Sequence, residues 1–365
     1  MTSPESISAK RILVIAMRFL GDVLLTTALI RSIRLAYPEA QLDVLVYGNT
    51  AAMLEGNPDV NQILTTPTRP QWADYRRLLP RLFRRYDVAV VTQTGDRPFL
   101  YAFLAAPFRV GAVPQRHATG WWKRFFMQRW TEFDDVNTHT VLQHLKLTDL
   151  LAIPRQYELV PPQIRTAGRL AERFGFLTSA SAYAVLHPHP QWTYKRWTLE
   201  GWVDIGQYLA GLGLTVVLSG GPAQEEVDYV AGIAEKLPPD TVNLAGQVSL
   251  AELAYIIGRA SLFIGPDTGI THMAAATGVA VITLYGPTNP VKWAPWPKGY
   301  GDNSNPFRQV GSRRIGNIAL VQGEGDCVPC HLEGCDRHRQ SRSRCLDELL
   351  PERIKAEVRQ LLVND

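Results

Sequence analysis

Short apolar runs alternate with amphipathic stretches through most of this chain. In the first half we predict strands at residues 11–17, 42–47, 60–64, 87–92 and 109–113, and helices at residues 21–37, 75–85 and 138–152. Short apolar runs bounded by turn residues are typical of buried strands, whereas apolar positions three and four residues apart are typical of helices. Their alternation predicts an α/β domain built on a parallel sheet.

The second half has the same rhythm without repeating the sequence. We predict strands at residues 183–186, 214–218, 241–244, 262–264 and 280–285, and helices at residues 199–211, 224–236, 249–259, 270–277 and 348–362. Ser249 with Glu252 three residues later forms a capping box that marks one helix start. The predicted fold class is therefore α/β with two Rossmann-like domains, which we expect to face each other across a cleft.

Prolines at residues 154–162 interrupt the pattern between the two halves. We predict a first domain at residues 1–160, a second at residues 175–347, and a final helix at residues 348–365 that packs back toward the first domain. We expect the two domains to close on ligand about residues 154–162, as sites between domains commonly do.

Composition places the chain among globular proteins, with 46% hydrophobic and 20% charged residues. No stretch is long and apolar enough to span a membrane, and the N-terminus lacks the apolar core of a signal peptide. We therefore expect a cytoplasmic location. The net charge of +4 is modest, but arginines gather at residues 69–85 and 337–344. Taken alone, the first cluster is best interpreted as a solvated helix face. Since no nucleic-acid-binding module is recognisable, we expect no nucleic-acid partner.

Four cysteines lie late in the chain, at Cys327, Cys330, Cys335 and Cys345. Stable disulfides are not expected in the cytoplasm. Clustered thiols could hold a structural zinc ion, although the spacing does not match a standard two-knuckle finger. Reduced thiols in a loop are the interpretation that we favour.

The most informative segment for chemistry joins two predicted strands through a helix. Residues 265–269 read Gly-Pro-Asp-Thr-Gly and lead directly into the helix, and Gly286, Pro287 and Thr288 follow the next strand. Ligands of parallel sheets bind at the carboxyl ends of the strands, and a helix N-terminus favours an anion. Thr268, Gly269 and His272 therefore indicate a pyrophosphate site, although similar turns also occur without a ligand.

Three further segments carry candidate residues. Arg18 to Asp22 follows the first strand but is not a G-x-G-x-x-G fingerprint, which disfavours nicotinamide binding. Asp22 fits a helix N-cap, the commoner role, or a general base. Thr193 and Lys195 suit a departing diphosphate, unless Lys195 and Arg196 form an ordinary surface pair. Glu225 or Glu226 beside Gly220 and Gly221 could bind ribose hydroxyls, unless both acids only favour a helix N-terminus.

In their order along the chain, these segments resemble the ADP-heptose:lipopolysaccharide heptosyltransferases, inverting glycosyltransferases of the GT-B type. The matching residues are Gly21 and Asp22, Lys195 with Trp197, Asp267 to Gly269 with His272, and Gly286 to Thr288. The resemblance implies that Asp22 is the general base, that Lys195 stabilises the departing ADP, and that no cofactor or catalytic metal is needed. It further implies donor binding by a set of residues in the second domain, namely Thr193, Glu225, Asp267, Thr268, Gly269, His272, Gly286 and Thr288.

The resemblance leaves the acceptor open, because the aromatic segments at residues 99–107 and 121–130 match no motif of the family. Basic groups among these aromatics suit an anionic sugar carried on a lipid, and peripheral contact with the inner membrane surface. We predict acceptor contacts from the first domain by Arg18, Arg97, Arg109, Arg116, Lys123 and Arg124. A glycosyltransferase that uses another nucleotide sugar and a non-catalytic nucleotide-sugar-binding protein are the alternatives.

Overall fold

The computed structural model describes residues 8–115, 120–164, 166, 168–179 and 181–362 and divides the chain into two compact units. The first unit comprises residues 1–162 together with 299–305, and the second comprises residues 163–298 together with 306–365. No helix of the described residues has the length and apolarity needed to cross a bilayer.

The first unit is built on a six-stranded parallel sheet of order β3-β2-β1-β4-β5-β6. Its strands are β1 (Arg11–Ile15), β2 (Gln41–Tyr47), β3 (Gln62–Thr66), β4 (Val88–Val91), β5 (Phe108–Pro114) and β6 (Arg129–Phe133). The central strands β1 and β4 are almost wholly apolar because helices cover both of their faces.

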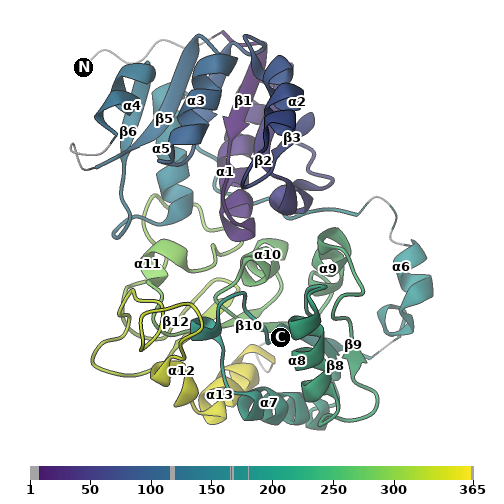
Figure 1. Ribbon diagram of the computed structural model, residues 1–365. Coiled ribbons are helices and arrows are strands. Elements are labelled where there is room, and N and C mark those ends of the chain that lie inside the picture. The colour runs from purple at the N-terminus through teal and green to yellow at the C-terminus, as the bar shows by residue number, and fades with distance from the viewer. Residues whose placement is uncertain (1–7, 116–119, 165, 167, 180, 363–365) are drawn as a thin grey trace. The chain divides into compact units, whose positions relative to one another are not determined.

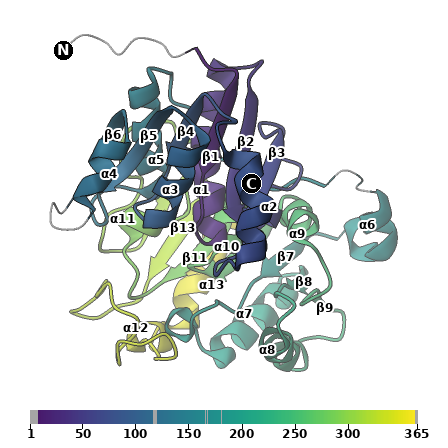
Figure 2. The same cartoon turned by 45° about the horizontal axis from the view of Figure 1, so that its top comes forward.

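Helices α2 (Trp72–Leu82), α3 (Asp96–Ala105) and α4 (Trp121–Phe126) cover one face of this sheet, and α1 (Leu20–Ala36) and α5 (Thr140–Leu151) cover the other (Figures 1 and 2). The 3-10 helix η1 (Gly48–Leu54) follows β2. The strand order reverses between β1 and β4, and the carboxyl ends of these two strands are where doubly wound folds place their ligands.

The second unit repeats this strand order. Its seven-stranded sheet has the order β12-β13-β11-β10-β7-β8-β9 and is parallel except for the edge strand β12. The strands are β7 (Tyr183–Leu186), β8 (Thr215–Leu218), β9 (Val242–Asn243), β10 (Leu262–Pro266), β11 (Val281–Tyr285), β12 (Arg313–Ile315) and β13 (Ile318–Gln322). Here the order reverses between β7 and β10.

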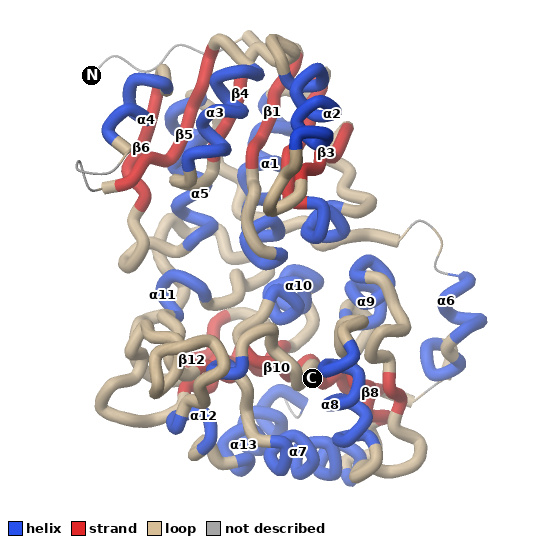
Figure 3. The backbone as a smooth tube through the Cα atoms, viewed as in Figure 1, coloured by secondary structure: helices blue, strands red, loops and turns tan. Residues whose placement is uncertain are grey.

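Helices lie on both faces of this second sheet (Figure 3). They are α6 (Gly168–Arg173), η2 (Gly175–Leu177), η3 (Thr193–Lys195), α7 (Leu199–Gly211), α8 (Gln224–Ala234), α9 (Leu250–Ile257), α10 (Gly269–Thr277), α11 (Pro290–Trp293), α12 (Arg344–Asp347) and α13 (Pro351–Leu362). The predicted capping box of Ser249 and Glu252 is present at the start of α9.

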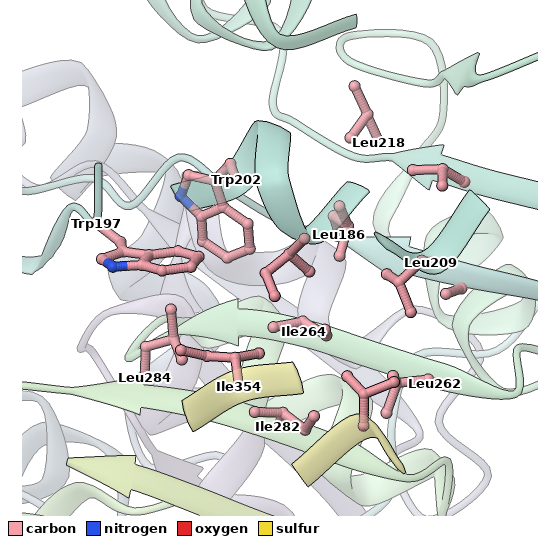
Figure 4. Packing of buried hydrophobic residues seen from close by; sticks show 14 of the residues in the cluster. Leu186, Trp197, Trp202, Leu209, Leu218, Leu262, Ile264, Ile282, Leu284 and Ile354 are labelled. Carbon is pink, nitrogen blue, oxygen red and sulfur yellow. The ribbon is translucent and has the colours of Figure 1, made fainter. Parts of the chain in front are cut away.

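The main core of the second unit lies between one face of the sheet and α7, α8 and α13. Trp197 and Trp202 pack edge to face at 5.2 Å beside Leu186, Ile264 and Leu284 (Figure 4). The prediction that the last helix packs back on the first domain is wrong, because Ile354 and Val358, one turn apart on α13, are fully buried in this core. Because both side chains are buried there, the apolar face of α13 packs within the second unit.

Residues 154–162, which we predicted as the linker, are packed on α1 instead. The backbone N–H of Gln156 donates to Ser32 Oγ at 2.9 Å, and that of Val160 donates to Thr27 Oγ1 at 3.0 Å. Leu159 and Val160 are buried. The chain therefore leaves the first unit only after Pro162, and it crosses again on either side of residues 299–305.

Candidate active site

The carboxyl ends of β7 and β10, the neighbouring strands where the second sheet reverses, each carry one member of an ion pair. Lys195 lies in η3, after β7, and Asp267 directly follows β10. Lys195 Nζ is 2.6 Å from Asp267 Oδ2. The carboxylate of Asp267 is buried and Lys195 is largely so, so the pair is held in a poorly solvated place where its charges act strongly.

Several groups converge on the Asp267 carboxylate. The Tyr285 hydroxyl at the end of β11 lies 3.2 Å from Oδ1 and 2.6 Å from the Trp293 carbonyl, which share its one proton, and Thr288 donates through its side chain. Burial by itself raises the pKa of Asp267, but Lys195, His272 and the hydrogen bond from Thr288 outweigh it and hold the pKa below its ordinary value. Asp267 is therefore an anion at neutral pH and fixes the position of Lys195.

Helix α10 begins immediately beyond this pair. Thr268 is its N-cap, and the Thr268 side chain accepts from the backbone N–H of Thr271. The first N–H groups of the helix, at Gly269 and Ile270, have no intrahelical acceptor, which makes this end suited to an anion. The sequence prediction of Thr268, Gly269 and Asp267 as neighbours of one site agrees with this geometry.

His272 lies in the first turn and a half of α10, with Nε2 4.0 Å from Asp267 Oδ1. Burial, together with Lys195 and against the opposing effect of Asp267, lowers the pKa of His272 to about 4. The imidazole is thus neutral at pH 7 and adds no charge to the site. Its buried Nδ1 has no hydrogen-bond partner among the described residues.

Glu225 belongs to a second cluster at the carboxyl ends of β7 and β8. Its side chain is exposed and pairs with Arg196 at 3.2 Å and with His189 at 3.8 Å. Arg196 in turn lies over the Tyr229 ring at 4.9 Å. The sequence interpretation of Lys195 and Arg196 as one basic pair is therefore incomplete, because the two cations serve different clusters.

Two glycines that we assigned to ligand approach have packing roles. A Cβ at Gly286 would lie 2.8 Å from Leu346 Cγ, so this glycine admits α12 against the end of β11. A Cβ at Gly221 would lie 2.7 Å from Glu226 Oε2. Thr193, the first residue of η3, is half-buried next to Lys195, and no hydrogen bond of its hydroxyl is seen within the described part of the chain.

The first unit has a pocket of about 380 Å³ at its own reversal point, between the carboxyl ends of β1 and β4. Arg18, Phe19, Gln93 and Arg97 are among its lining residues. Asp22 lies beside it in the first turn of α1, largely buried, with Oδ1 3.4 Å from Arg18 Nε. The N-cap interpretation of Asp22 is wrong, because the N-cap residue is Phe19 and no side chain caps this end.

Lys123 and Arg124, predicted as surface cations for an acceptor, are engaged within the first unit. Lys123 is buried, its Nζ lies 2.6 Å from Asp96 Oδ1, and it donates to the Thr94 carbonyl. Arg124 is largely buried and pairs with Glu132 at 3.1 Å. Both therefore brace α4, and neither is exposed as the prediction required.

The remaining predicted acceptor arginines differ among themselves. Arg97 lines the pocket while donating to the Tyr47 hydroxyl and the Thr68 carbonyl. Arg109 donates to the carbonyls of Phe126 and Ala106. Arg116 lies outside the described residues.

The four cysteines lie in and just after a loop without helix or strand that precedes α12 (Figure 3). They are free thiols. Burial, followed by the other three cysteines, raises the pKa of Cys345 to about 11. Among the residues that the structure describes, no three His, Cys, Asp or Glu side chains are arranged to hold a metal ion, so the zinc interpretation lacks support.

Comparison with known proteins identifies the family of this chain. The model of glycosyltransferase family 9 (heptosyltransferase) matches residues 75–319, about two thirds of the chain. The chain belongs to this family. Lipopolysaccharide heptosyltransferase 3 of Escherichia coli is 28% identical over 292 residues, covering 77% of this chain and 84% of that protein.

Solved structures of the family share the fold. A family 9 glycosyltransferase from Veillonella parvula has a TM-score of 0.78 at 19% identity, covering 98% of both chains. ADP-heptose heptosyltransferase II of Escherichia coli has a TM-score of 0.71 at 20% identity, covering 97% of this chain and 99% of that one. The predicted fold class of two Rossmann-like α/β domains and the predicted family are both confirmed.

Proposed function

We propose that this glycosyltransferase moves a heptose from ADP-heptose to a sugar of the lipopolysaccharide core, with inversion at the anomeric carbon. The observation that carries the donor half is the Lys195–Asp267 pair beside the N-terminus of α10. Relatives are named lipopolysaccharide heptosyltransferases, and solved relatives are described with ADP and with ADP-2-deoxy-2-fluoro heptose.

On the donor side, the diphosphate would lie against the N-terminal amides of α10 and the ammonium group of Lys195. As the bond from the anomeric carbon to the diphosphate oxygen breaks, negative charge grows on ADP. A fixed cation and oriented N–H groups stabilise that charge without reorganising. Asp267 positions Lys195, and the neutral His272 lies beside this carboxylate with Nε2 4.0 Å from Oδ1.

On the acceptor side, Asp22 would take the proton of the attacking hydroxyl as its oxygen bonds to the anomeric carbon. Asp22 is largely buried at the positive end of α1 and lies next to a pocket of sugar size. The products are the new glycoside, ADP and a protonated Asp22, so one displacement gives inversion.

The test is whether the purified protein transfers heptose from ADP-heptose to a core acceptor that lacks its terminal heptose. The reaction is measured through the ADP that it releases. We expect Asp22→Asn to lower the rate by roughly 10²–10⁴-fold while ADP affinity stays close to wild type. Asp149→Asn, which removes an exposed carboxylate paired with Arg155, is the matched control. Turnover with UDP- or GDP-sugars but not with ADP-heptose would show that the proposed donor is wrong. A folded Asp22→Asn enzyme with the wild-type rate would show that Asp22 is not the general base.

A lipid-linked acceptor also calls for contact with an anionic membrane, for which we propose the face formed by α2, α3 and α4. Large aromatic side chains are exposed on these helices, with Trp72 74% and Phe125 77% exposed, and Phe83, Phe103 and Trp121 at least half exposed. Arginines 76, 84 and 85 accompany them. Exposed aromatics with cations suit a membrane interface.

Sedimentation with phosphatidylglycerol vesicles tests this surface. Replacement of Trp121 and Phe125 by serine should reduce binding severalfold, because two interfacial anchors are lost. Leu35→Ser, at an exposed residue of α1 on the opposite face of the sheet, is the control. Equal sedimentation of both variants and wild type would exclude this face.

A further inference from the structure

A second pocket in the first unit, of about 510 Å³, lies at the carboxyl end of β3, where α2 approaches the segment after that strand. Its lining includes Thr65, Thr66 and Thr68 from the end of β3 and the following turn, and Arg77 and Arg81 from α2. It is separate from the groove on the other side of α2, which Arg76, Pro80 and Phe83 help to line.

The two arginines of this pocket are one helical turn apart, so their side chains leave the same side of α2. Neither guanidinium forms an ion pair or hydrogen bond with any described residue, although most arginines of the first unit do. Asp74 also lines the pocket, but its Oδ2 accepts from the backbone N–H of Gln71 in the N-terminal capping box of α2. Two cations therefore face a hollow whose lining contains one carboxylate, that of Asp74, and neither cation forms an ion pair with it.

The wall opposite the arginines supplies hydroxyl groups. Thr65 and Thr68 are exposed to the pocket, and Thr66 is buried. Thr66 Oγ1 lacks a hydrogen-bond partner of normal geometry in the described structure, as does the hydroxyl of its neighbour Tyr101. The exposed hydroxyls of Thr65 and Thr68 can donate to a bound acceptor atom.

We propose that this pocket binds a phosphate monoester on the acceptor. A phosphate monoester carries a charge near −2 at neutral pH and offers three acceptor oxygens. Two guanidiniums and several hydroxyls match that charge and number of acceptors. A carboxylate has one charge and two oxygens, so a single arginine would satisfy it and the second cation would stay unpaired.

The phosphate site adjoins the pocket beside Asp22. Asn49 and Thr68 line both pockets. Arg97 donates to the carbonyls of Thr68 and Pro67 and so braces the wall between them. Resting on the proposed function, this places the phosphate site next to the pocket proposed for the attacking sugar, and it makes phosphorylation of the acceptor a determinant of specificity.

Direct binding can be measured without any transfer reaction, by following the ³¹P resonance of inorganic phosphate in a phosphate-free buffer that contains saturating ADP to fill the proposed donor site. We expect the folded variant Arg77→Gln/Arg81→Gln to bind phosphate at least about tenfold more weakly than wild type, because both charge-assisted contacts are lost. Arg84→Gln/Arg85→Gln removes the same charge from exposed arginines just beyond α2, outside the pocket, and should bind like wild type. Equal phosphate affinity in all three proteins would overturn the proposal.

Kinetics with delipidated core saccharides then separate the acceptor assignment from membrane effects. For the untreated acceptor, the KM of Arg77→Gln/Arg81→Gln should be about tenfold higher than that of wild type, with kcat unchanged. For the acceptor treated with phosphatase, the variant and wild type should have the same KM. If the KM of the variant relative to wild type does not depend on phosphorylation of the acceptor, the acceptor assignment is refuted. If phosphate binds as expected but no heptose is transferred to any acceptor, the proposed function fails and the anion site stands.

Discussion

The Lys195–Asp267 pair shows at the level of single residues how the proposed donor site is held. A buried carboxylate is costly unless a cation and hydrogen bonds compensate it, and here the cation is also the candidate catalytic group. We predict that Lys195→Ala lowers the free energy of unfolding by roughly 3 kcal/mol, since Asp267 is left buried without its partner.

Adding Asp267→Asn to Lys195→Ala should recover part of that loss, because the uncompensated charge is removed. Chemical denaturation of the two single variants and the double variant gives the coupling energy directly. ADP binding should stay weak in the double variant even as stability returns. Strictly additive losses would show that the two side chains do not act as a pair.

Sequence could predict that Lys195, Asp267 and His272 lie together as candidate site residues, because each follows a predicted strand at the edge where ligands bind. It could not predict Tyr285 as a partner of Asp267. This tyrosine ends the apolar strand β11, where it looks like a core residue until the register with β10 is known. The prediction of Lys123 as an exposed cation was wrong because its acidic partner, Asp96, lies 27 positions away on another helix, so the sequence around Lys123 does not show the pair.

At the scale of elements, the terminal helix illustrates what periodicity determines and what it leaves open. The spacing of Ile354 and Val358 predicts an amphipathic helix correctly, but a stripe of two apolar residues does not specify which surface it covers. The answer comes from the neighbouring helix α7 and strands β11 and β13 of the second sheet. Similarly, the short helices α3 and α4 escaped prediction because their aromatic residues suggested a binding segment.

We predict that Ile354→Ala destabilises the protein by roughly 2–4 kcal/mol, since it opens a cavity under Trp197 and Leu284 in the core of Figure 4. Arg359→Ala, at an exposed position of the same helix, should change stability by less than about 0.5 kcal/mol. Equal midpoints in denaturant for both variants would contradict the placement of α13.

The whole molecule should respond to acid through histidines that are buried in their neutral form. His187, after β7, is fully buried with Nδ1 3.1 Å from Ser219 Oγ, and burial lowers its pKa to about 4, as it does for His272. In the unfolded chain both would titrate near 6.5. Because the folded pKa is the lower one, the unfolded state binds more protons between these values.

Stability from these two groups is therefore complete above about pH 6.5 and is lost as pH falls toward about 4, by on the order of 3 kcal/mol for each histidine. The free energy of unfolding, measured in denaturant at several pH values, should fall steeply over this range. His187→Asn keeps a polar atom facing Ser219 but cannot take up the proton, so its stability should depend less steeply on pH by about one proton. His338→Asn, at an exposed histidine in the loop before α12, should keep the wild-type slope. If His187→Asn and wild type lose stability in parallel between pH 6.5 and 4, then His187 is not buried in its neutral form, and the acid response must arise from other groups.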